Sequence, residues 1–219
     1  MTTRITKKKS KRRNGNLEPR KKPVQARSKE SVRAILEATA QVFEQYGYAA
    51  GTTNRIAERA GVSIGTLYQY FPNKESLAVA LLEDHLSKGQ HLLNDWVGEV
   101  LASGMNLTQA ITFFIEGMLD MHAGYPRLHH VLLEETPIPP RVHDTFLKIM
   151  GQAAKTVAGL LKGFSEVKRE SLEDAAFLIV QTVEVLTHRH STHPGLGLTR
   201  QKFSLELAAM ITSYLKSSS

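Results

Sequence analysis

The chain has 219 residues, of which 42% are hydrophobic and 22% are charged, as is typical of a globular protein. It contains no cysteine, which excludes disulfide bonds and thiolate chemistry. No apolar run reaches the roughly 18 residues that a membrane-spanning helix needs. The basic N-terminus also lacks the apolar segment of a secretory signal. We therefore expect a protein without a membrane segment.

The net charge of +7 is concentrated at the start of the chain. Residues 1–30 hold twelve Lys and Arg residues against two Glu residues. Residues 1–27 have no apolar periodicity and contain two prolines and a glycine, so we interpret them as a flexible basic arm. Such an arm either keeps the protein in solution or contacts a polyanion through its phosphates.

An amphipathic helix is predicted over residues 28–46, because apolar residues recur there at helical spacing. Gly47 is expected to end this helix in a left-handed conformation. Two short helices follow, with Thr52 as the N-cap of the first and Ser63 as the N-cap of the second. Gly61 lies between them, where the chain must turn.

Pro72 stops the second short helix, and Asn73 caps the longer helix that follows. The rest of the chain has helical periodicity, and no stretch alternates polar and apolar residues as a strand would. The predicted fold class is therefore all-α, with about nine helices. The later helices are expected at residues 74–97, 106–123, 126–135, 140–163, 170–190 and 199–216.

Two short helices joined by a glycine-containing turn are the minimal unit that reads a DNA major groove. The second helix enters the groove by its N-terminal end, and the small or polar residues among positions 63–66 suit that approach. Gly65 costs about 1 kcal/mol relative to alanine in a helix. Either a close approach to DNA or packing against the first helix explains it. Tyr68, Tyr70 and Lys74 are placed for phosphates, although Tyr68 also fits a core position and Lys74 an exposed surface.

Residues 52–77, TTNRIAERAGVSIGTLYQYFPNKESL, closely resemble the helix-turn-helix of the tetracycline-repressor (TetR) family. With the preceding helix, the resemblance covers about residues 28–85. It implies a bacterial, cytoplasmic, nucleoid-associated transcriptional regulator that binds double-stranded operator DNA. The DNA contacts that it implies are at Thr52, Thr53, Asn54, Ser63, Ile64, Gly65, Thr66, Tyr68, Tyr70 and Lys74.

Many members of the family carry a polar or basic residue at the base-facing positions, where this chain has Ile64 and Gly65. This departure favours apolar or shape-based discrimination, with Asn54 as the best polar reader. The region from residue 31 to residue 75 has no net charge. The basic arm in front of the motif is therefore expected to supply the missing electrostatic attraction to DNA.

The resemblance also implies a DNA-binding domain at residues 28–75 and a helical effector-binding and dimerisation domain at residues 76–219. A homodimer is expected through the helices at 170–190 and 199–216, although an ordinary intramolecular core is the alternative for their apolar stripes. These stripes comprise Ala175, Leu178, Ile179, Thr182, Val183 and Leu186, and Phe203, Leu207, Met210, Ile211 and Tyr214.

The middle helices offer aromatic and methionine side chains that suit an apolar or amphipathic effector, but they suit a plain core equally well. No effector-binding residue is therefore assigned. The residues in question are Trp96, Phe113, Phe114, Met118, Met121, Tyr125, Phe146 and Met150.

The expected function is that of a repressor that a small molecule releases from a palindromic operator. The alternatives are a DNA-binding regulator without an effector, and an activator. No catalytic motif is visible, so neither an enzyme nor a cofactor is predicted. His188 and His190 should point to different sides of a helix, so no metal site is predicted in the histidine-rich segment 188–193. That segment is interpreted as a polar helix end at the rim of the dimer interface.

Overall fold

The computed structural model of the chain describes residues 26–136, 140–193 and 197–218. Within these ranges the chain forms nine α-helices and one π-helical turn and contains no strand, which confirms the predicted all-α class. The basic arm predicted over residues 1–27 lies outside the described residues, except for its last two positions. None of the described helices is long and apolar enough to cross a membrane.

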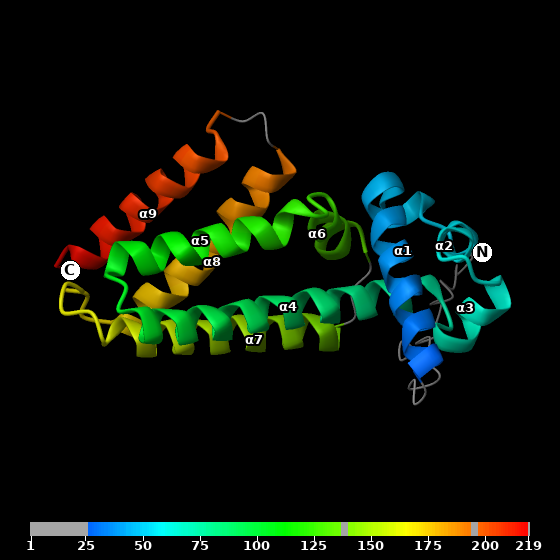
Figure 1. Cartoon of the computed structure of the whole chain (residues 1–219), viewed down its shortest axis with the longest axis horizontal. Helices are drawn as coiled ribbons and strands as arrows, with labels where there is room; N and C mark the ends of the chain where they lie inside the picture. Colours follow the sequence, from blue (N-terminus) through cyan, green and yellow to red (C-terminus); the bar gives the residue numbers. More distant parts are fainter. Residues whose placement is uncertain (1–25, 137–139, 194–196, 219) are drawn as a thin grey trace, which may run out of the picture.

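Helices α1 (Ala26–Ala50), α2 (Thr53–Arg59) and α3 (Ile64–Tyr70) form a unit at one end of the molecule (Figure 1). Gly47 has the predicted positive φ, 72°, but its ψ of 177° produces a kink rather than a helix end. The helix therefore resumes for a few residues as far as Ala50. Gly51 follows the last residue of this helix and is closely packed, because a Cβ atom there would lie 2.6 Å from the Phe43 ring.

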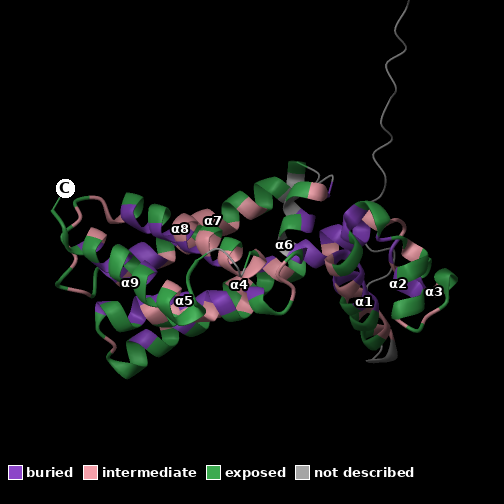
Figure 2. Ribbon diagram, turned by 90° about the horizontal axis from the view of Figure 1, so that it is seen from above, coloured by how far each residue is buried: buried purple, intermediate pink, exposed green. Residues whose placement is uncertain are grey.

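The remaining helices form a longer bundle beside this unit (Figure 1). Figure 2 shows their buried residues along the faces that meet one another, as expected for amphipathic helices. The bundle consists of α4 (Lys74–Ser103), α5 (Leu107–Ala123), α6 (Leu128–His130), the π-helical turn η1 (Val131–Glu135), α7 (Pro140–Leu161), α8 (Leu172–Thr192) and α9 (Arg200–Lys216).

Helix α4 joins the two parts of the fold. It begins with a capping box, in which the Asn73 side chain accepts from the Ser76 N–H while the Ser76 hydroxyl lies against the Asn73 backbone. Its first turns bury Leu77 and Leu81 in the core of the N-terminal helices, and later turns bury Leu93 and other side chains in the bundle core. The helix continues through Gly98, beyond the predicted end at residue 97. The chain turns only at Gly104, where φ is 68°.

The segment after α5 was predicted as one helix over residues 126–135. It is instead the short helix α6 followed by the π-helical turn η1. Leu128, Val131 and Leu132 from this segment complete the core beneath α1. A π-helical turn is rare and is often found at functional positions, and here it lies between the bundle and the N-terminal helices.

Candidate nucleic-acid interface

The turn between α2 and α3 is built by local hydrogen bonds, as the sequence predicted. The Thr52 hydroxyl accepts from the Arg55 N–H at 3.4 Å, and the Ser63 hydroxyl accepts from the Thr66 N–H at 3.0 Å. Gly61 adopts a φ of 66°, which favours glycine because a Cβ atom is strained in that region. These caps hold the two short helices at a fixed angle with the start of α3 exposed.

The start of α3 exposes an apolar side chain, Ile64, next to the uncovered backbone of Gly65. Ile64 is 38% exposed although it is large and apolar. A Cβ atom at Gly65 would meet only the Ser63 hydroxyl, at 3.7 Å, which is ordinary contact. Packing against α2 therefore does not require glycine at this position. The backbone at Gly65 is therefore open to close approach from outside the protein.

Tyr68 lies on the same exposed side and not in the core. Its side chain is 40% exposed, and its hydroxyl lies 3.0 Å from Thr53 Oγ1 at the start of α2. Tyr70 is partly buried, and its hydroxyl lies 3.2 Å from the Ser28 hydroxyl. Tyr68 thus joins the starts of α2 and α3 into one surface, while Tyr70 ties α3 to the beginning of α1.

Lys74 is held against the end of α1 rather than extended into solvent. Its ammonium group donates to the Tyr48 carbonyl oxygen at 2.7 Å and lies 4.0 Å over the Tyr48 ring. A cation at a helix C-terminus is electrostatically favourable. Burial lowers the pKa of Lys74, and the charge of Glu75 opposes this shift. A phosphate contact at Lys74 stays a prediction, and it would share an ammonium group that already has partners.

Helix α2 supplies two further cations near this surface, Arg55 and Arg59. The sequence of α3, IGTLYQY, contains no charged residue. The Arg59 guanidinium donates to Gln41 and Gln45 on α1, at 3.1 Å in each case, so it secures α2. Arg55 is exposed and stacks over the Tyr46 ring at 4.3 Å. Arg55 is not among the DNA contacts predicted from the sequence. Its position next to Asn54, before a helix without charged residues, could have indicated it.

Polar contacts join α1 to the segment after α5. The Tyr125 hydroxyl donates to the Glu37 carboxylate, and the Arg127 backbone N–H donates to Glu44 at 3.2 Å. These pairs connect positions more than 80 residues apart. They attach the helix that supports α2 and α3 to the end of a bundle helix.

Glu135 in η1 adds a third attachment. Its carboxylate accepts from the Tyr48 N–H at 2.9 Å and lies 3.3 Å from the Arg127 guanidinium. A Cβ atom at Gly47 would lie 2.7 Å from this carboxylate, so glycine is required both by its φ and by the close approach. We call these residues the α1 latch: Glu37, Glu44, Tyr48, Tyr125, Arg127 and Glu135.

A cavity of about 180 Å³ lies between α4, α5, α7 and α8. Five of the side chains suggested for a pocket line it, namely Phe114, Met118, Met121, Phe146 and Met150. Among the others, Trp96 is buried in the core with its indole N–H on the Ala110 carbonyl oxygen, Phe113 is exposed and Tyr125 belongs to the latch. The polar lining residues include His85, Gln90, Asn94, Gln152, Thr156 and Glu184.

The apolar stripes predicted on the last two helices face two ways. The intramolecular alternative holds for part of them, because Ala175, Ile179, Val183, Leu207 and Ile211 are buried in the bundle core. Leu178 and Met210 are 51% exposed. The apolar side chains that these helices expose to solvent are Phe177, Leu178, Val185, Leu205 and Met210.

The histidines at the end of α8 point to different sides, as predicted. The His188 ring packs edge-on against His122, with ring centroids 5.6 Å apart. The His190 ring stacks on Phe203 at 4.3 Å. His188 is therefore partly buried in the bundle rather than lying on a polar helix end.

Comparison with known families decides the identity of the fold. Residues 35–81 match the family described as bacterial regulatory proteins, tetR family, and residues 106–215 match the tetracyclin repressor-like C-terminal domain. The second match alone covers half of the chain. The chain belongs to the tetR family. This is a family of bacterial regulatory proteins, and its N-terminal match includes most of the helix-turn-helix whose resemblance to the family is seen at residues 52–77.

Curated relatives of this tetR-family chain include a transcriptional regulator and a receptor protein. It is 31% identical over 105 residues to the HTH-type transcriptional regulator RutR of Escherichia coli K12. The aligned segment covers 47% of this chain and 46% of RutR. It is 40% identical over 63 residues to the A-factor receptor protein of Streptomyces griseus. That aligned segment covers 29% of this chain and 23% of the receptor protein. The chain thus spans less than half the length of these relatives. None of them is named as an enzyme.

Solved structures resemble the tetR-family chain over most of its length. A tetR-family regulator from Mesorhizobium loti has a TM-score of 0.67 at 16% identity and covers 87% of this chain and 98% of its own. FadR from Bacillus subtilis, solved in complex with stearoyl-CoA, has a TM-score of 0.62 at 17% identity and covers 85% of this chain and 98% of its own. At these identities the likeness shows the fold alone.

Proposed function

We propose that this protein is a repressor that binds a palindromic operator as a homodimer and leaves it when a small amphipathic molecule enters the cavity. One observation carries the proposal. Met121 and His85 line both the cavity and a second hollow of about 690 Å³ against α1. A ligand in the bundle cavity would therefore touch two side chains that also face the hollow next to α1.

The start of α3 is proposed to enter the major groove, with Ser63, Ile64, Gly65 and Thr66 facing the bases. The exposed Ile64 and the uncovered backbone of Gly65 favour a close, largely apolar fit. Because α3 carries no charge, affinity for DNA depends on other segments, above all the basic arm. The remaining proposed contacts are Thr52, Thr53, Asn54, Tyr68, Tyr70 and Lys74.

The effector is proposed to be amphipathic because both apolar and polar side chains line the cavity. Phe114, Met118, Phe146 and other apolar side chains form most of the wall, while polar side chains such as Gln90 and Asn94 stand among them. A cavity of this kind buries an apolar body and orients it by a few polar contacts. The stearoyl-CoA bound by the related fold of FadR is a ligand of the same general character.

Release from DNA is proposed to pass through the α1 latch. The end of α5 carries Met121, which faces the cavity, and four residues later Tyr125 bonds to Glu37 on α1. A ligand that favours a different position for the end of α5 would shift α1, and with it the reading helix. In a dimer the two reading helices must match two half-sites, so a small rotation of each is enough to lose affinity.

The dimer is proposed to form through the outer faces of α8 and α9. Their exposed apolar side chains, among them Phe177, Leu178 and Met210, would meet the same residues of a second copy around a two-fold axis. This gives a four-helix interface in which the buried stripes of the same helices remain part of each bundle core.

The test begins with recovery of the genomic fragments that the protein binds, followed by gel-shift titration of the recovered operator. Tyr68→Ala should raise the apparent dissociation constant by an amount equivalent to about 1–3 kcal/mol, as expected for the loss of a DNA contact. Phe113→Ala is the matched control, because Phe113 is an aromatic residue of similar exposure on α5. Equal operator affinity for Tyr68→Ala and the unaltered protein would contradict the proposed interface.

A second arm tests the cavity. Ala153→Phe places a ring in the cavity wall and should leave operator binding intact. Fatty acids or aromatic carboxylic acids that release the unaltered protein from DNA should no longer release this variant. Release of both proteins at the same concentration would place the effector site elsewhere.

A further inference from the structure

Three side chains that carry metal-binding groups converge at the edge of the cavity. His85 lies on α4, His122 on α5 and Glu184 on α8. One ligand atom from each lies within 4.8 Å of the others, and His122 Nε2 is 3.9 Å from Glu184 Oε1. The His85 and His122 rings have centroids 5.7 Å apart. These residues are distant in the sequence, so no local spacing could have predicted the cluster.

The donor set is one that suits a transition-metal ion. Imidazole favours zinc, copper, nickel and iron, whereas magnesium and calcium favour oxygen ligands alone. Zinc bonds of about 2.0–2.2 Å in a tetrahedral site place neighbouring donor atoms about 3.3–3.6 Å apart. The 3.9 Å between His122 and Glu184 is close to that separation. His85 and Glu184 are only partly buried, so small side-chain rotations can bring the three atoms together.

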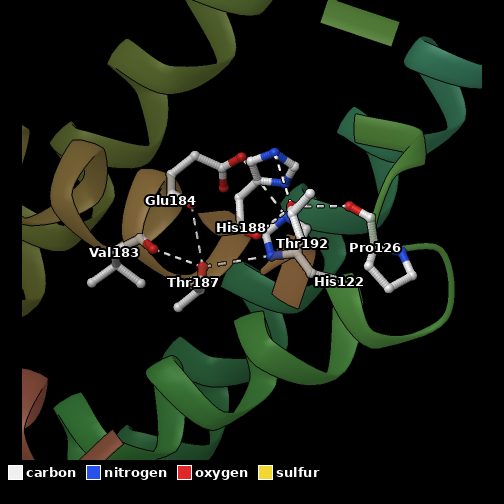
Figure 3. Close-up of polar contacts among 7 residues, drawn as sticks. All are labelled: His122, Pro126, Val183, Glu184, Thr187, His188 and Thr192. Carbon is white, nitrogen blue, oxygen red and sulfur yellow. Dashed lines mark hydrogen bonds and ion pairs between the residues drawn. The ribbon is translucent and has the colours of Figure 1, made fainter. Parts of the chain in front are cut away.

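His122 is oriented by a neighbour in the way that metal-bound histidines commonly are. The Thr187 hydroxyl donates to the Val183 carbonyl oxygen at 2.7 Å, so its oxygen can accept from His122 Nδ1–H, which lies 3.5 Å away (Figure 3). With this tautomer Nε2 is the unprotonated nitrogen of His122, and it lies 3.9 Å from Glu184 Oε1. Thr187 is fully buried and His122 is 3% exposed, so the pair is fixed by packing.

We propose that His85, His122 and Glu184 bind a divalent transition-metal ion of the zinc class, and that this ion regulates operator binding. Three protein ligands leave a coordination position for water or for a donor atom of an effector in the cavity. The ion would draw α8 toward α4, which leads into the N-terminal helices, and toward the end of α5. His122 lies three residues before Tyr125 of the latch. The regulatory half of this inference rests on the proposed function, whereas the metal site does not.

Metal binding is tested on the full chain after treatment with a chelator. Zn²⁺ is titrated in competition with a chromophoric chelator, and we expect one tightly bound ion per chain. His85→Ala should weaken zinc binding at least about tenfold, the size of effect seen for changes around metal sites. His91→Ala is the matched control, because His91 is exposed on the same helix and outside the cluster. Thr187→Val keeps all three ligands and should weaken binding about 10–100-fold through the orientation of His122.

Equal zinc affinity for His85→Ala and His91→Ala would overturn the site and leave His122 and Glu184 as an ordinary partly buried pair. Gel shifts with Zn²⁺ and with chelator test the regulatory half. A change in operator affinity that occurs in the unaltered protein but not in His85→Ala supports it. Operator binding that is the same with and without Zn²⁺ would overturn regulation while leaving the proposed repressor intact. Failure to bind any operator under both conditions would contradict the proposed function, while the zinc titration would still decide the site.

Discussion

At the scale of single residues, Gly65 is the clearest sign of what α3 is built to approach. Glycine at the second position of a seven-residue helix is unfavourable, and nothing inside the protein requires it. The exposed Ile64 beside it is unfavourable in water as well. Both residues become reasonable if the start of α3 is covered when the protein binds DNA.

Gly65→Ala should therefore have opposite effects on stability and on binding. The added methyl group finds space, so the free energy of unfolding should rise by about 0.4–1 kcal/mol, because alanine restricts the unfolded chain. Operator affinity should fall, because the same methyl group stands between the backbone and DNA. Gly98→Ala on α4 also has open space and should stabilise without changing DNA binding. Denaturant unfolding and gel shifts measure both quantities, and unchanged operator affinity for Gly65→Ala would refute the close approach.

At the scale of elements, the α1 latch contains a carboxylate, Glu135, whose charged form is favoured by its partners. The hydrogen bond from the Tyr48 N–H lowers the pKa of Glu135, and Arg127 adds to the shift. A carboxylate whose folded-state pKa lies below its unfolded value stabilises the fold when it is ionised. The contribution is complete above the ordinary pKa of 4.5 and is lost as the pH falls through the lowered folded-state value.

Glu135→Gln should flatten this acid-side dependence. As the pH falls from about 5 to about 3, the unaltered protein should lose more unfolding free energy than the variant, because only the former must protonate a carboxylate held in its charged form. Urea unfolding at several pH values measures the difference. Glu134→Gln is the matched control, since it removes one carboxylate at the exposed neighbouring position in η1. Parallel profiles for Glu135→Gln and the unaltered protein would show that the latch does not act through this charge.

At the scale of the whole molecule, the last two helices carry apolar residues on more than one face. Their inner faces complete the bundle core, and their outer faces leave five large apolar side chains 51–58% exposed. Apolar residues scattered singly on a surface need no explanation, but a group on neighbouring helices marks an interaction surface. A two-fold DNA reader requires such a surface, because each chain supplies one reading helix.

Leu178→Glu combined with Met210→Glu should produce a monomer. Facing carboxylates would be buried without partners, which is strongly unfavourable. Operator affinity should fall steeply, because one chain can engage only one half-site. Leu101→Glu is the control, since Leu101 is 73% exposed on α4 and lies outside these helices. Light scattering measures the mass of each variant, and a persistent dimer in the double variant would exclude the proposed interface.

Much of the reading unit could be predicted because its signals are local. Thr52, Ser63 and Asn73 each accept from a backbone N–H three residues away, so the cap and its partner share one short stretch of sequence. Gly61 is fixed by the conformation of its own turn. Helix α4 extends beyond the predicted end at residue 97 and stops at Gly104, which has a left-handed conformation.

The sequence by itself thus determined an all-α regulator of the tetR family and the place of its helix-turn-helix. Only the tertiary structure decided which residues connect that unit to the bundle. The latch joins residues 83–88 positions apart, and the histidine cluster joins three helices. Helical periodicity tells which face of a helix is buried but not which partner meets it. That choice arises from the packing of the whole bundle, where the same apolar residues serve as a core, a cavity wall or an exposed surface.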